Sequence, residues 1–284
     1  MSQVQWFPGH MAKTKKQITE YLRKVDILIE VLDARAPEAS TNPLLARLTE
    51  NKPKIVLLNK DDLADPDVTK KWYDIFISDG RTIPIAVSAS SRKGLDKITA
   101  ACINLTRGAR WHKRRAVRAM IAGIPNVGKS TIINSISRRR KAEAGATPGL
   151  TRDLRRIPVN RQLELFDTPG LLWHKFDDPV TGLILASLGA LKETILPEEE
   201  VTGAFLSFMA EVYPERLSRR YKLENTDLSS HELVEMVGRR RGCLTGGGKI
   251  DFSRTSQIVL KDLREGRFGR ITLEWPGRRG WRAD

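Results

Sequence analysis

The sequence predicts an α/β fold with a mostly parallel sheet, followed by a smaller all-helical domain. Short, nearly continuous apolar runs such as residues 27–32 and 55–58 end at turn residues, which is typical of buried strands. Segments with a helical pattern alternate with these runs, and that alternation indicates βαβ units. From residue 181 onward the pattern is helical, with prolines at positions 179, 197 and 214 between the segments.

The expected elements of the first part follow one another in a regular order. The expected strands are residues 27–32, 54–58, 82–87, 118–122, 154–159 and 162–166. The last two are separated by Asn160-Arg161, which is a hairpin signal. The expected helices are residues 12–24, 43–48, 66–79, 94–105 and 131–137. Further on, Ser229 and Glu232 have the spacing of a capping box, which opens a helix that ends at residues 239–242.

Length and composition limit the possible architectures. At 284 residues, with 40% apolar and 29% charged residues, the chain can form about two soluble domains of roughly 150 residues each. We place the domains at residues 1–175 and 176–276, and we assign no role to the basic extension at 277–284. Cys102 and Cys243 lie far apart, which excludes a disulfide framework or a zinc site as the organising principle.

No apolar run approaches the ~20 residues that span a bilayer, and the N-terminus lacks the basic-then-apolar layout of a signal peptide. We therefore expect a cytoplasmic protein with no membrane partner.

The net charge of +15 and the isoelectric point near 10.0 favour a polyanionic partner such as RNA. Residues 107–141 hold eleven lysines or arginines and no acidic residue, and residues 236–284 are also rich in basic side chains. Because the basic residues gather in two separate stretches, the sequence favours a binding surface over a surface that is evenly charged and solvated. The expected RNA-binding residues are Arg239, Arg240, Arg241 and Lys249. For the arginine run alone, a solvated helix end with favourable dipole interactions is the alternative.

The strongest motif is Gly123-Ile124-Pro125-Asn126-Val127-Gly128-Lys129-Ser130, which fits the phosphate-loop pattern between an expected strand and an expected helix. Backbone amides at the helix start would face the phosphates of a nucleotide. The lysine would reach the β- and γ-phosphates, and the serine would bind Mg²⁺. The expected nucleotide contacts of this loop are Asn126, Val127, Gly128, Lys129, Ser130 and Thr131.

A second motif, Asp167-Thr168-Pro169-Gly170, follows the hairpin. Asp167 would contact Mg²⁺ through water, and the Gly170 amide would meet the γ-phosphate. Thr151 would supply a second hydroxyl to Mg²⁺ from a loop, residues 140–152, that orders on the γ-phosphate. Alone, a D-x-x-G pattern is more often a turn, but about forty residues after a phosphate loop it predicts a nucleotide switch.

Base recognition is predicted at Asn59-Lys60-Asp61-Asp62, which fits N-K-x-D at the end of a buried strand. Asp62 can accept from the two donors on guanine that adenine lacks, and leaving that carboxylate unpaired would weaken binding. Ser88-Ala89 follows the next strand and offers backbone groups to the guanine O6. Each motif alone is also compatible with a turn or a helix cap, but together with the phosphate loop they predict a GTPase.

The order of these motifs is unusual. Base recognition at 59–62 and 88–89 precedes phosphate binding at 123–130 and the switches at 151 and 167–170. A site requires its loops to be adjacent in space and not in sequence, so the chain is predicted to be a circularly permuted GTPase. The second switch then lies at the exit of the domain and leads directly into the residues after 176.

These residues resemble the YlqF/RbgA family of circularly permuted ribosome-biogenesis GTPases. The resemblance rests on Trp6-Phe7-Pro8-Gly9-His10-Met11, Asp33-Ala34-Arg35-Ala36-Pro37 and the permuted motifs, and it extends over residues 5–275, including 246–251 and 262–267. It implies a role in late assembly of the large ribosomal subunit, with GTP hydrolysis stimulated by that particle. It also implies a C-terminal helical domain that contacts rRNA.

The family resemblance bears on two further residues. Asn126 matches a loop asparagine that accompanies K⁺-stimulated GTPases, and the alternative is a loop-stabilising hydrogen bond. Many GTPases orient the attacking water with a glutamine after D-x-x-G, but this chain has Leu171 there. The family is similar in this respect, so a polar group must come from elsewhere. His10 is the predicted catalytic residue, and a structural or RNA-facing histidine is the alternative.

Two other functions are compatible with parts of the sequence. A GTP-regulated RNA-binding or translation-control factor could use hydrolysis only to time its release. A phosphate-loop kinase acting on a small molecule is a third reading, but Asp62 argues against it because a kinase more usually takes ATP. A kinase would also carry an acceptor pocket and a lid, and nothing in residues 176–284 resembles either of them.

Overall fold

The chain folds into two compact units, residues 1–175 and 176–284. A computed structural model describes residues 16, 18–109, 111, 114–137, 155–168, 178–191, 195–279 and 281. Among the helices within these ranges, none is both long and apolar enough to cross a membrane.

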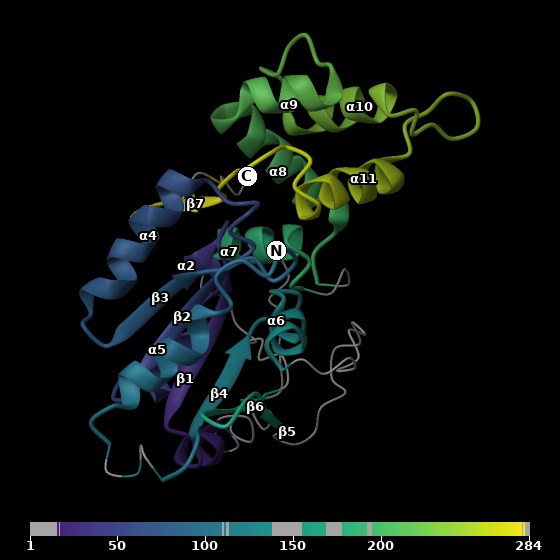
Figure 1. Cartoon of the computed structure of the whole chain (residues 1–284). Helices are drawn as coiled ribbons and strands as arrows, with labels where there is room; N and C mark the ends of the chain where they lie inside the picture. Colours follow the sequence, from purple (N-terminus) through teal and green to yellow (C-terminus); the bar gives the residue numbers. More distant parts are fainter. Residues whose placement is uncertain are drawn as a thin grey trace. The chain divides into compact units, whose positions relative to one another are not determined.

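The first unit contains a six-stranded, mostly parallel sheet (Figure 1). Its strands are β1 (Ile27–Asp33), β2 (Lys54–Asn59), β3 (Thr82–Ala86), β4 (Val117–Gly123), β5 (Arg155–Pro158) and β6 (Leu163–Asp167). Their order is β3-β2-β1-β4-β6-β5, and the described pairs are parallel except β5–β6. The predicted α/β class and the predicted hairpin are therefore confirmed. Leu154, the first residue of the expected hairpin, lies outside the described residues.

Five helices of the first unit have complete bounds within the described residues. They are α2 (Pro37–Ser40), α3 (Pro43–Leu48), α4 (Pro66–Ser78), α5 (Lys97–Thr106) and α6 (Lys129–Ile136). The starts of α3 and α4 follow one rule: Asn42 and Asp65 cap the first amides, and proline occupies the first turn, where its missing N–H is not needed. Of the expected helix 12–24, residues 18–23 are described and helical.

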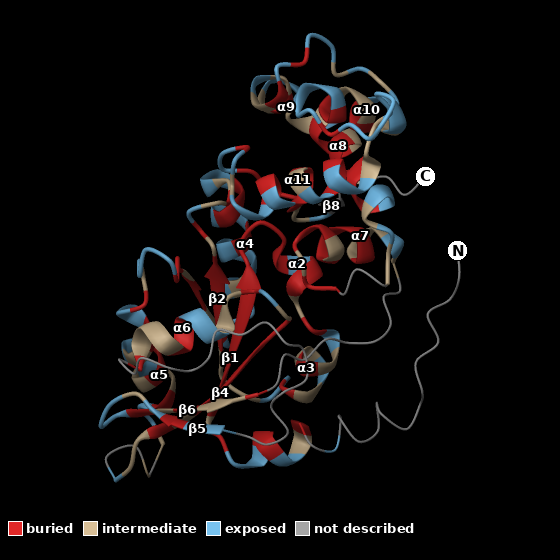
Figure 2. Ribbon diagram, turned by 90° about the vertical axis from the view of Figure 1, so that its right-hand side faces the viewer, coloured by how far each residue is buried: buried red, intermediate tan, exposed pale blue. Residues whose placement is uncertain are grey.

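Helices cover both faces of this sheet, and β1, with all seven residues buried, lies at its centre (Figure 2). On one face, Ile18 and Leu22 pack with Leu45 of α3 against Leu28 and Met120 of the strands. The other face is covered by α5, which contacts β3 and β4, and by α6, which contacts β4. Continuous apolar strands are what a sheet buried on both sides requires.

The register of the strands places the predicted motifs at one edge of the sheet. Asp33 pairs with Asn59, Leu58 with Ala86, Val31 with Gly123 and Ile121 with Asp167. The carboxyl ends of β1, β2, β3, β4 and β6 therefore lie side by side. The chain builds the sheet outward from β1 through β2 to β3 and then returns to place β4 on the other side of β1. Ligands of open α/β sheets bind at such a reversal, outside the carboxyl ends of the strands.

The second unit is mainly helical and is organised around one helix. Its elements are α7 (Pro179–Ser187), α8 (Glu198–Val212), α9 (Pro214–Tyr221), α10 (Ser230–Arg240), α11 (Phe252–Arg264) and the short strands β7 (Glu274–Trp275) and β8 (Arg278–Arg279). Helix α8 contacts α7, α9, α10 and α11. The predicted capping box is present, because Ser229 and Glu232 each bond the other's backbone amide. The β7–β8 hairpin is an addition to the helices that the sequence pattern did not indicate.

The C-terminal segment forms part of the core of this unit. The Trp281 ring is 4% exposed, stacks on Phe208 with 5.3 Å between ring centroids, and lies 6.0 Å from the ring of Phe205. Its indole nitrogen donates to the Leu273 carbonyl oxygen at 3.1 Å. The stretch 277–284, to which the sequence assigned no role, therefore supplies a core residue. The basic composition of the stretch gave no indication of this burial, because the contacts are made by a single tryptophan.

Candidate nucleotide site

The phosphate loop joins β4 to α6, and its surroundings require two of its glycines. A β-carbon on Gly123 would lie 2.8 Å from the carbonyl oxygen of Val31 in the neighbouring strand. Gly128 has a φ of +96°, and a β-carbon there would lie 2.3 Å from the side-chain nitrogen of Asn59. Gly128 directly precedes α6, so the first amides of that helix are available to an anion bound in the loop.

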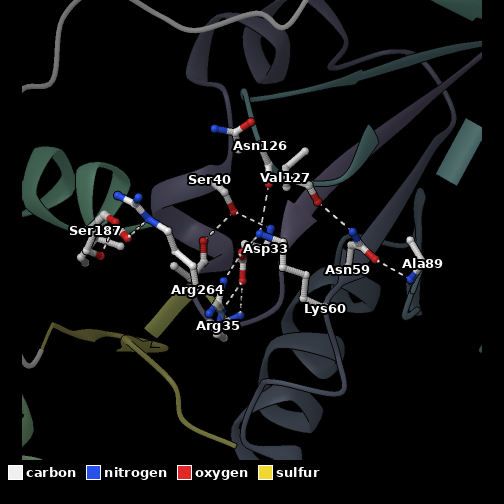
Figure 3. A network of polar contacts seen from close by, with 12 residues as sticks. Asp33, Arg35, Ser40, Asn59, Lys60, Ala89, Asn126, Val127, Ser187 and Arg264 are labelled. Carbon is white, nitrogen blue, oxygen red and sulfur yellow. Dashed lines mark hydrogen bonds and ion pairs between the residues drawn. The ribbon is translucent and has the colours of Figure 1, made fainter. Parts of the chain in front are cut away.

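The side chain of Asn59, at the end of β2, ties this loop to the loop after β3. Its Nδ2 donates to the Val127 carbonyl oxygen at 2.7 Å, and its Oδ1 accepts from the Ala89 amide at 3.1 Å (Figure 3). Asn59 is 1% exposed, so both bonds are shielded from water. One buried amide thus sets the distance between the expected phosphate and base loops.

Lys60 makes a second link across the same edge. Its amine donates to the Asn126 carbonyl oxygen at 3.0 Å and lies 2.9 Å from the Asp33 carboxylate (Figure 3). Both Lys60 and Asn126 have positive φ, 62° and 58°. Non-glycine residues hold this conformation at a cost, and it persists where the surrounding contacts fix it.

The two aspartates of N-K-x-D have different surroundings. Asp61 is 6% exposed, and its carboxylate lies 2.9 Å from the amine of Lys93. Asp62 is exposed, and its carboxylate makes no hydrogen bond or ion pair with another described residue. Asp61 therefore serves the local structure of the loop, whereas Asp62 offers a carboxylate to a ligand.

The expected base loop after β3 is held mostly by its own polar groups. Ser88 is fully buried, its hydroxyl lies 3.0 Å from that of Ser90, and it accepts from the Ser91 amide at 3.4 Å. The Ser88 amide donates to the Lys93 carbonyl oxygen at 3.1 Å. Because the Ser88 side chain is used internally, a ligand would meet the backbone of this loop.

Lys129, at the start of α6, contacts the end of β6. Its amine donates to the Asp167 carboxylate and to the Thr168 carbonyl oxygen. Thr168 is fixed in turn, because its hydroxyl donates to the Ile121 carbonyl oxygen at 3.0 Å. The lysine of the phosphate loop and the aspartate of the switch motif are thus direct neighbours.

A divalent cation beside the phosphates would find oxygen ligands at this point. Ser130 lies exposed in the first turn of α6, next to Lys129 and its partner Asp167. A hydroxyl and a carboxylate are hard oxygen donors, which suit Mg²⁺ shared with substrate phosphates. Within the described part of the chain, no group of three or more His, Cys, Asp or Glu could hold a metal alone. The donor set therefore fits Mg²⁺ brought in with a nucleotide and not a protein-only metal cage.

His10, Thr151 and Gly170 lie outside the described residues. Sequence reasoning also missed contributors to the site, namely Asp33 and Lys93, which hold Lys60 and Asp61. The turn at residues 33–37 was noticed only as a mark of family resemblance, and nothing in the sequence indicated a partner for Lys93.

The predicted RNA-binding residues of the second unit lie close together. Arg239, Arg240 and Arg241 are exposed at the end of α10, and Arg240 pairs with Glu224 at 3.3 Å. The following loop folds back, with Leu244 bridged to Ile250 and the Asp251 amide bonded to the Cys243 carbonyl oxygen at 2.9 Å. This return brings the exposed Lys249 to the same end of the helix.

Comparison with known proteins agrees with this geometry. Residues 118–208 match the family described as 50S ribosome-binding GTPase. The chain is 44% identical to ribosome biogenesis GTPase A of Bacillus cereus over 96% of this chain and 94% of that protein. It is 31% identical to ribosome biogenesis GTPase A of Thermotoga maritima over 95% of this chain and 94% of that protein. The chain belongs to the ribosome biogenesis GTPase A family.

Two solved structures extend the match to the fold of this GTPase. YlqF from T. maritima in its GNP-bound form aligns with a TM-score of 0.66 at 28% identity, covering 93% of this chain and 98% of that chain. The GDP-bound form from the same source gives 0.65 at 26% identity, covering 92% and 100%. The predicted activity is therefore confirmed: the chain is a GTP hydrolase.

The family match covers one part of the predicted site of this GTPase. The match begins within β4, next to the phosphate loop, and leaves out residues 59–62 and 88–89. In an unpermuted GTPase the base-recognition segments come after the phosphate loop. The matched range therefore contains the phosphate loop and the switch motif at 167–170 and does not contain the base-recognition segments.

Proposed function

We propose that this GTPase binds the maturing large ribosomal subunit and hydrolyses GTP to time a late assembly step. The observation that carries the proposal is the near full-length similarity to proteins named ribosome biogenesis GTPase A. The net charge of +15 supports a polyanionic partner, and ribosomal RNA is such a partner. A role on ribosomal particles also implies a cytoplasmic location.

The motif residues at the carboxyl ends of the strands have proposed roles at the nucleotide. Asp62 accepts from guanine, the amides of residues 126–131 surround the phosphates, and Lys129 leaves Asp167 to reach the β- and γ-phosphates. Ser130 and Thr151 would hold Mg²⁺ directly, and Asp167 would hold it through water. When bound, the ion neutralises charge that develops on the phosphates. Gly170 would contact the γ-phosphate, so the second switch senses hydrolysis.

A K⁺ ion beside the phosphates is a further part of the proposal. Asn126 is exposed in the phosphate loop and held in left-handed backbone, and its family counterpart accompanies K⁺ stimulation. A cation there would offset charge that develops between the α- and γ-phosphates. GTPase rates measured in KCl and in NaCl at equal ionic strength should differ, and equal rates would remove the K⁺.

We propose that the second unit binds the ribosomal particle. Arg239–Arg241 and Lys249 form one exposed basic end of α10, which fits RNA phosphates. In the sequence, this unit follows the switch motif at 167–170 directly. GTP hydrolysis is therefore proposed to change the affinity of this unit for rRNA.

Sedimentation with ribosomal fractions tests the assembly role. The protein is mixed with mature subunits and with incomplete large subunits, in GDP, in GTP and in a non-hydrolysable GTP analogue. We expect preferential co-migration with incomplete large subunits in the GTP-like state. Binding to mature, translating ribosomes alone would support the translation-control alternative instead.

A further inference from the structure

A turn outside the recognised GTPase motifs lies against the nucleotide site. It comprises residues 33–37, Asp33-Ala34-Arg35-Ala36-Pro37, directly after the central strand β1. The Ala34 amide donates to the Asn59 carbonyl oxygen at 2.7 Å, which attaches the turn to the expected base-recognition segment. The turn is fixed from within as well, because the Asp33 amide donates to the Ser40 hydroxyl at 3.1 Å.

The Asp33 carboxylate is held by one buried arginine. The Nε of Arg35 donates to Oδ1 and its terminal nitrogen to Oδ2, each at 2.9 Å, and the Arg35 amide donates to Oδ1 at 3.1 Å. The two side chains are 2% and 1% exposed. Burial alone would raise the pKa of Asp33, but the charges of Arg35 and Lys60 hold that pKa well below its usual range. The carboxylate is therefore a fixed anion with a fixed orientation.

Lys60 is the member of this cluster that reaches solvent. Its side chain is 24% exposed, and its amine lies between Oδ2 of Asp33, at 2.9 Å, and the carbonyl oxygen of Asn126, at 3.0 Å (Figure 3). A free lysine side chain has many rotamers, and ordering it requires partners. Here one partner belongs to the end of β1 and the other to the phosphate loop.

Stability alone does not account for the buried pair. A buried aspartate–arginine pair adds little net stability compared with apolar residues of similar volume, because both charges lose their water. A fixed anion at the end of β1 does, however, determine where the Lys60 amine can lie. This lysine belongs to the N-K-x-D segment that the proposed function assigns to the base.

We propose that Asp33 is a positioning residue of the nucleotide site, which acts by holding Lys60 against the phosphate loop. Arg35 fixes Asp33, Asp33 holds the amine of Lys60, and the amine holds the Asn126 carbonyl oxygen. The base segment and the phosphate loop are thereby ordered before a nucleotide arrives, and this lowers the entropy lost on binding. The inference rests on the proposed base-recognition role of residues 59–62.

A double-mutant cycle on the full-length protein tests the route through Lys60. Affinity for GDP is measured by titration with a fluorescent GDP analogue for Asp33→Asn, Lys60→Met and the double variant. Each single variant should bind GDP about tenfold more weakly or worse, since each removes a charge-assisted bond. The double variant should be no weaker than Lys60→Met alone. Equal, independent losses from the two substitutions would overturn the proposal.

Asp26, next to the start of the same strand, provides a matched control. It precedes β1, accepts from two nitrogens of Arg115 at 2.7 and 2.8 Å, and also accepts from the Arg118 amide at 2.8 Å. Asp26→Asn removes a comparable ion pair at the opposite end of β1, so it should lower the melting temperature and leave GDP affinity unchanged. A loss of GDP affinity in this control equal to that of Asp33→Asn would attribute the effect to general destabilisation and reject positioning.

Two further variants keep the test decisive. If Asp33→Asn does not fold, Lys60→Met carries the proposal alone, and an unchanged GDP affinity in that variant overturns it. Lys60→Arg keeps a cation within reach of Asp33 and should restore most of the affinity. Asp62→Asn separates this inference from the base assignment, because it changes the preference among purines whereas Asp33→Asn lowers all affinities together. Unchanged selectivity in Asp62→Asn would reject the base assignment without deciding the Asp33–Lys60 cycle.

Discussion

Asn59 occupies the space that a side chain on Gly128 would need. Its Nδ2 would lie 2.3 Å from a β-carbon on Gly128, and the same nitrogen donates to the Val127 carbonyl oxygen at 2.7 Å. The N-K-x-D motif and the phosphate loop are 68 positions apart in sequence at this bond, yet each limits what the other can contain. A permuted order of motifs is therefore compatible with one intact site.

Gly128→Ala is the first prediction from this contact. Alanine at a φ of +96° is strained, by about 1–2 kcal/mol from the left-handed backbone, and its methyl group would displace the Asn59 amide. We expect a loss of GDP affinity of more than about tenfold, since the phosphate loop must move to relieve the clash. Gly80→Ala is the control, because Gly80 has a φ of +66° and nothing within 4 Å of an added β-carbon. It should lower the melting temperature without changing affinity, and equal affinity losses in both variants would contradict the prediction.

Asp62→Asn should weaken GTP binding and relax selectivity for guanine. The exposed carboxylate has two acceptor oxygens, and asparagine replaces one of them with a donor. The loss corresponds to about 1–3 kcal/mol of binding free energy, measured by titration with GTP and with xanthosine triphosphate. Asp61→Asn is the neighbouring control, since Asp61 contacts Lys93 instead, and it should keep the preference for guanine. If both nucleotides bind Asp62→Asn as they bind the natural protein, Asp62 does not read the base.

Replacing Arg239, Arg240 and Arg241 with alanine should weaken RNA binding and reduce its dependence on salt. Contacts with phosphates release counterions, so each lost contact lowers the slope of log affinity against log salt by about one. The control removes three exposed lysines of the first unit, Lys70, Lys71 and Lys97, and so lowers the net charge equally. Binding to ribosomal RNA is measured at several salt concentrations. A slope reduced as much in the control as in the arginine variant would reject a specific contact.

Trp281→Ala should destabilise the second unit by about 3–5 kcal/mol, because a buried ring that stacks on Phe208 is removed. Trp281→Phe keeps most of the packing and loses the bond to the Leu273 carbonyl oxygen, so a loss of about 1 kcal/mol is expected. Denaturant unfolding checks both values. Unfolding of Trp281→Ala at the natural midpoint would show that the C-terminal segment adds nothing to this core.

The parts of this protein that sequence predicts well are those with a local physical signature. Buried parallel strands such as β1 are almost continuous apolar runs, and the glycines of the phosphate loop are required by backbone geometry, so both could be predicted from the sequence. Contacts between distant charged residues leave no such pattern. The pairing of Lys60 with Asp33, and of Asp61 with Lys93, depends on strand order, which the sequence does not state. The burial of Trp281 could not be predicted from the sequence either, because its partners, Phe205 and Phe208, are distant in the chain on α8.

GTP hydrolysis requires a group that orients the attacking water. Leu171 stands where many GTPases have a glutamine, and a leucine side chain cannot orient water. Asp62 is proposed to contact the base, Asp61 contacts Lys93, and Lys129 contacts Asp167. A polar group must therefore come from another segment, and we propose His10, because imidazole can accept from water near neutral pH and Gly9 precedes it.

His10→Ala should bind GTP and GDP normally and lose most of the hydrolysis that ribosomal particles stimulate. A positioned general base or water-orienting group contributes typically about 10²–10⁴-fold, so the stimulated rate should fall by at least about 100-fold. The rate of free protein should change little, because His10 is proposed to reach the water only on the particle. His231→Ala, at an exposed position on α10, is the control for loss of a histidine. Single-turnover GTP hydrolysis with and without particles gives the comparison, and a normal stimulated rate in His10→Ala would mean that another group orients the water.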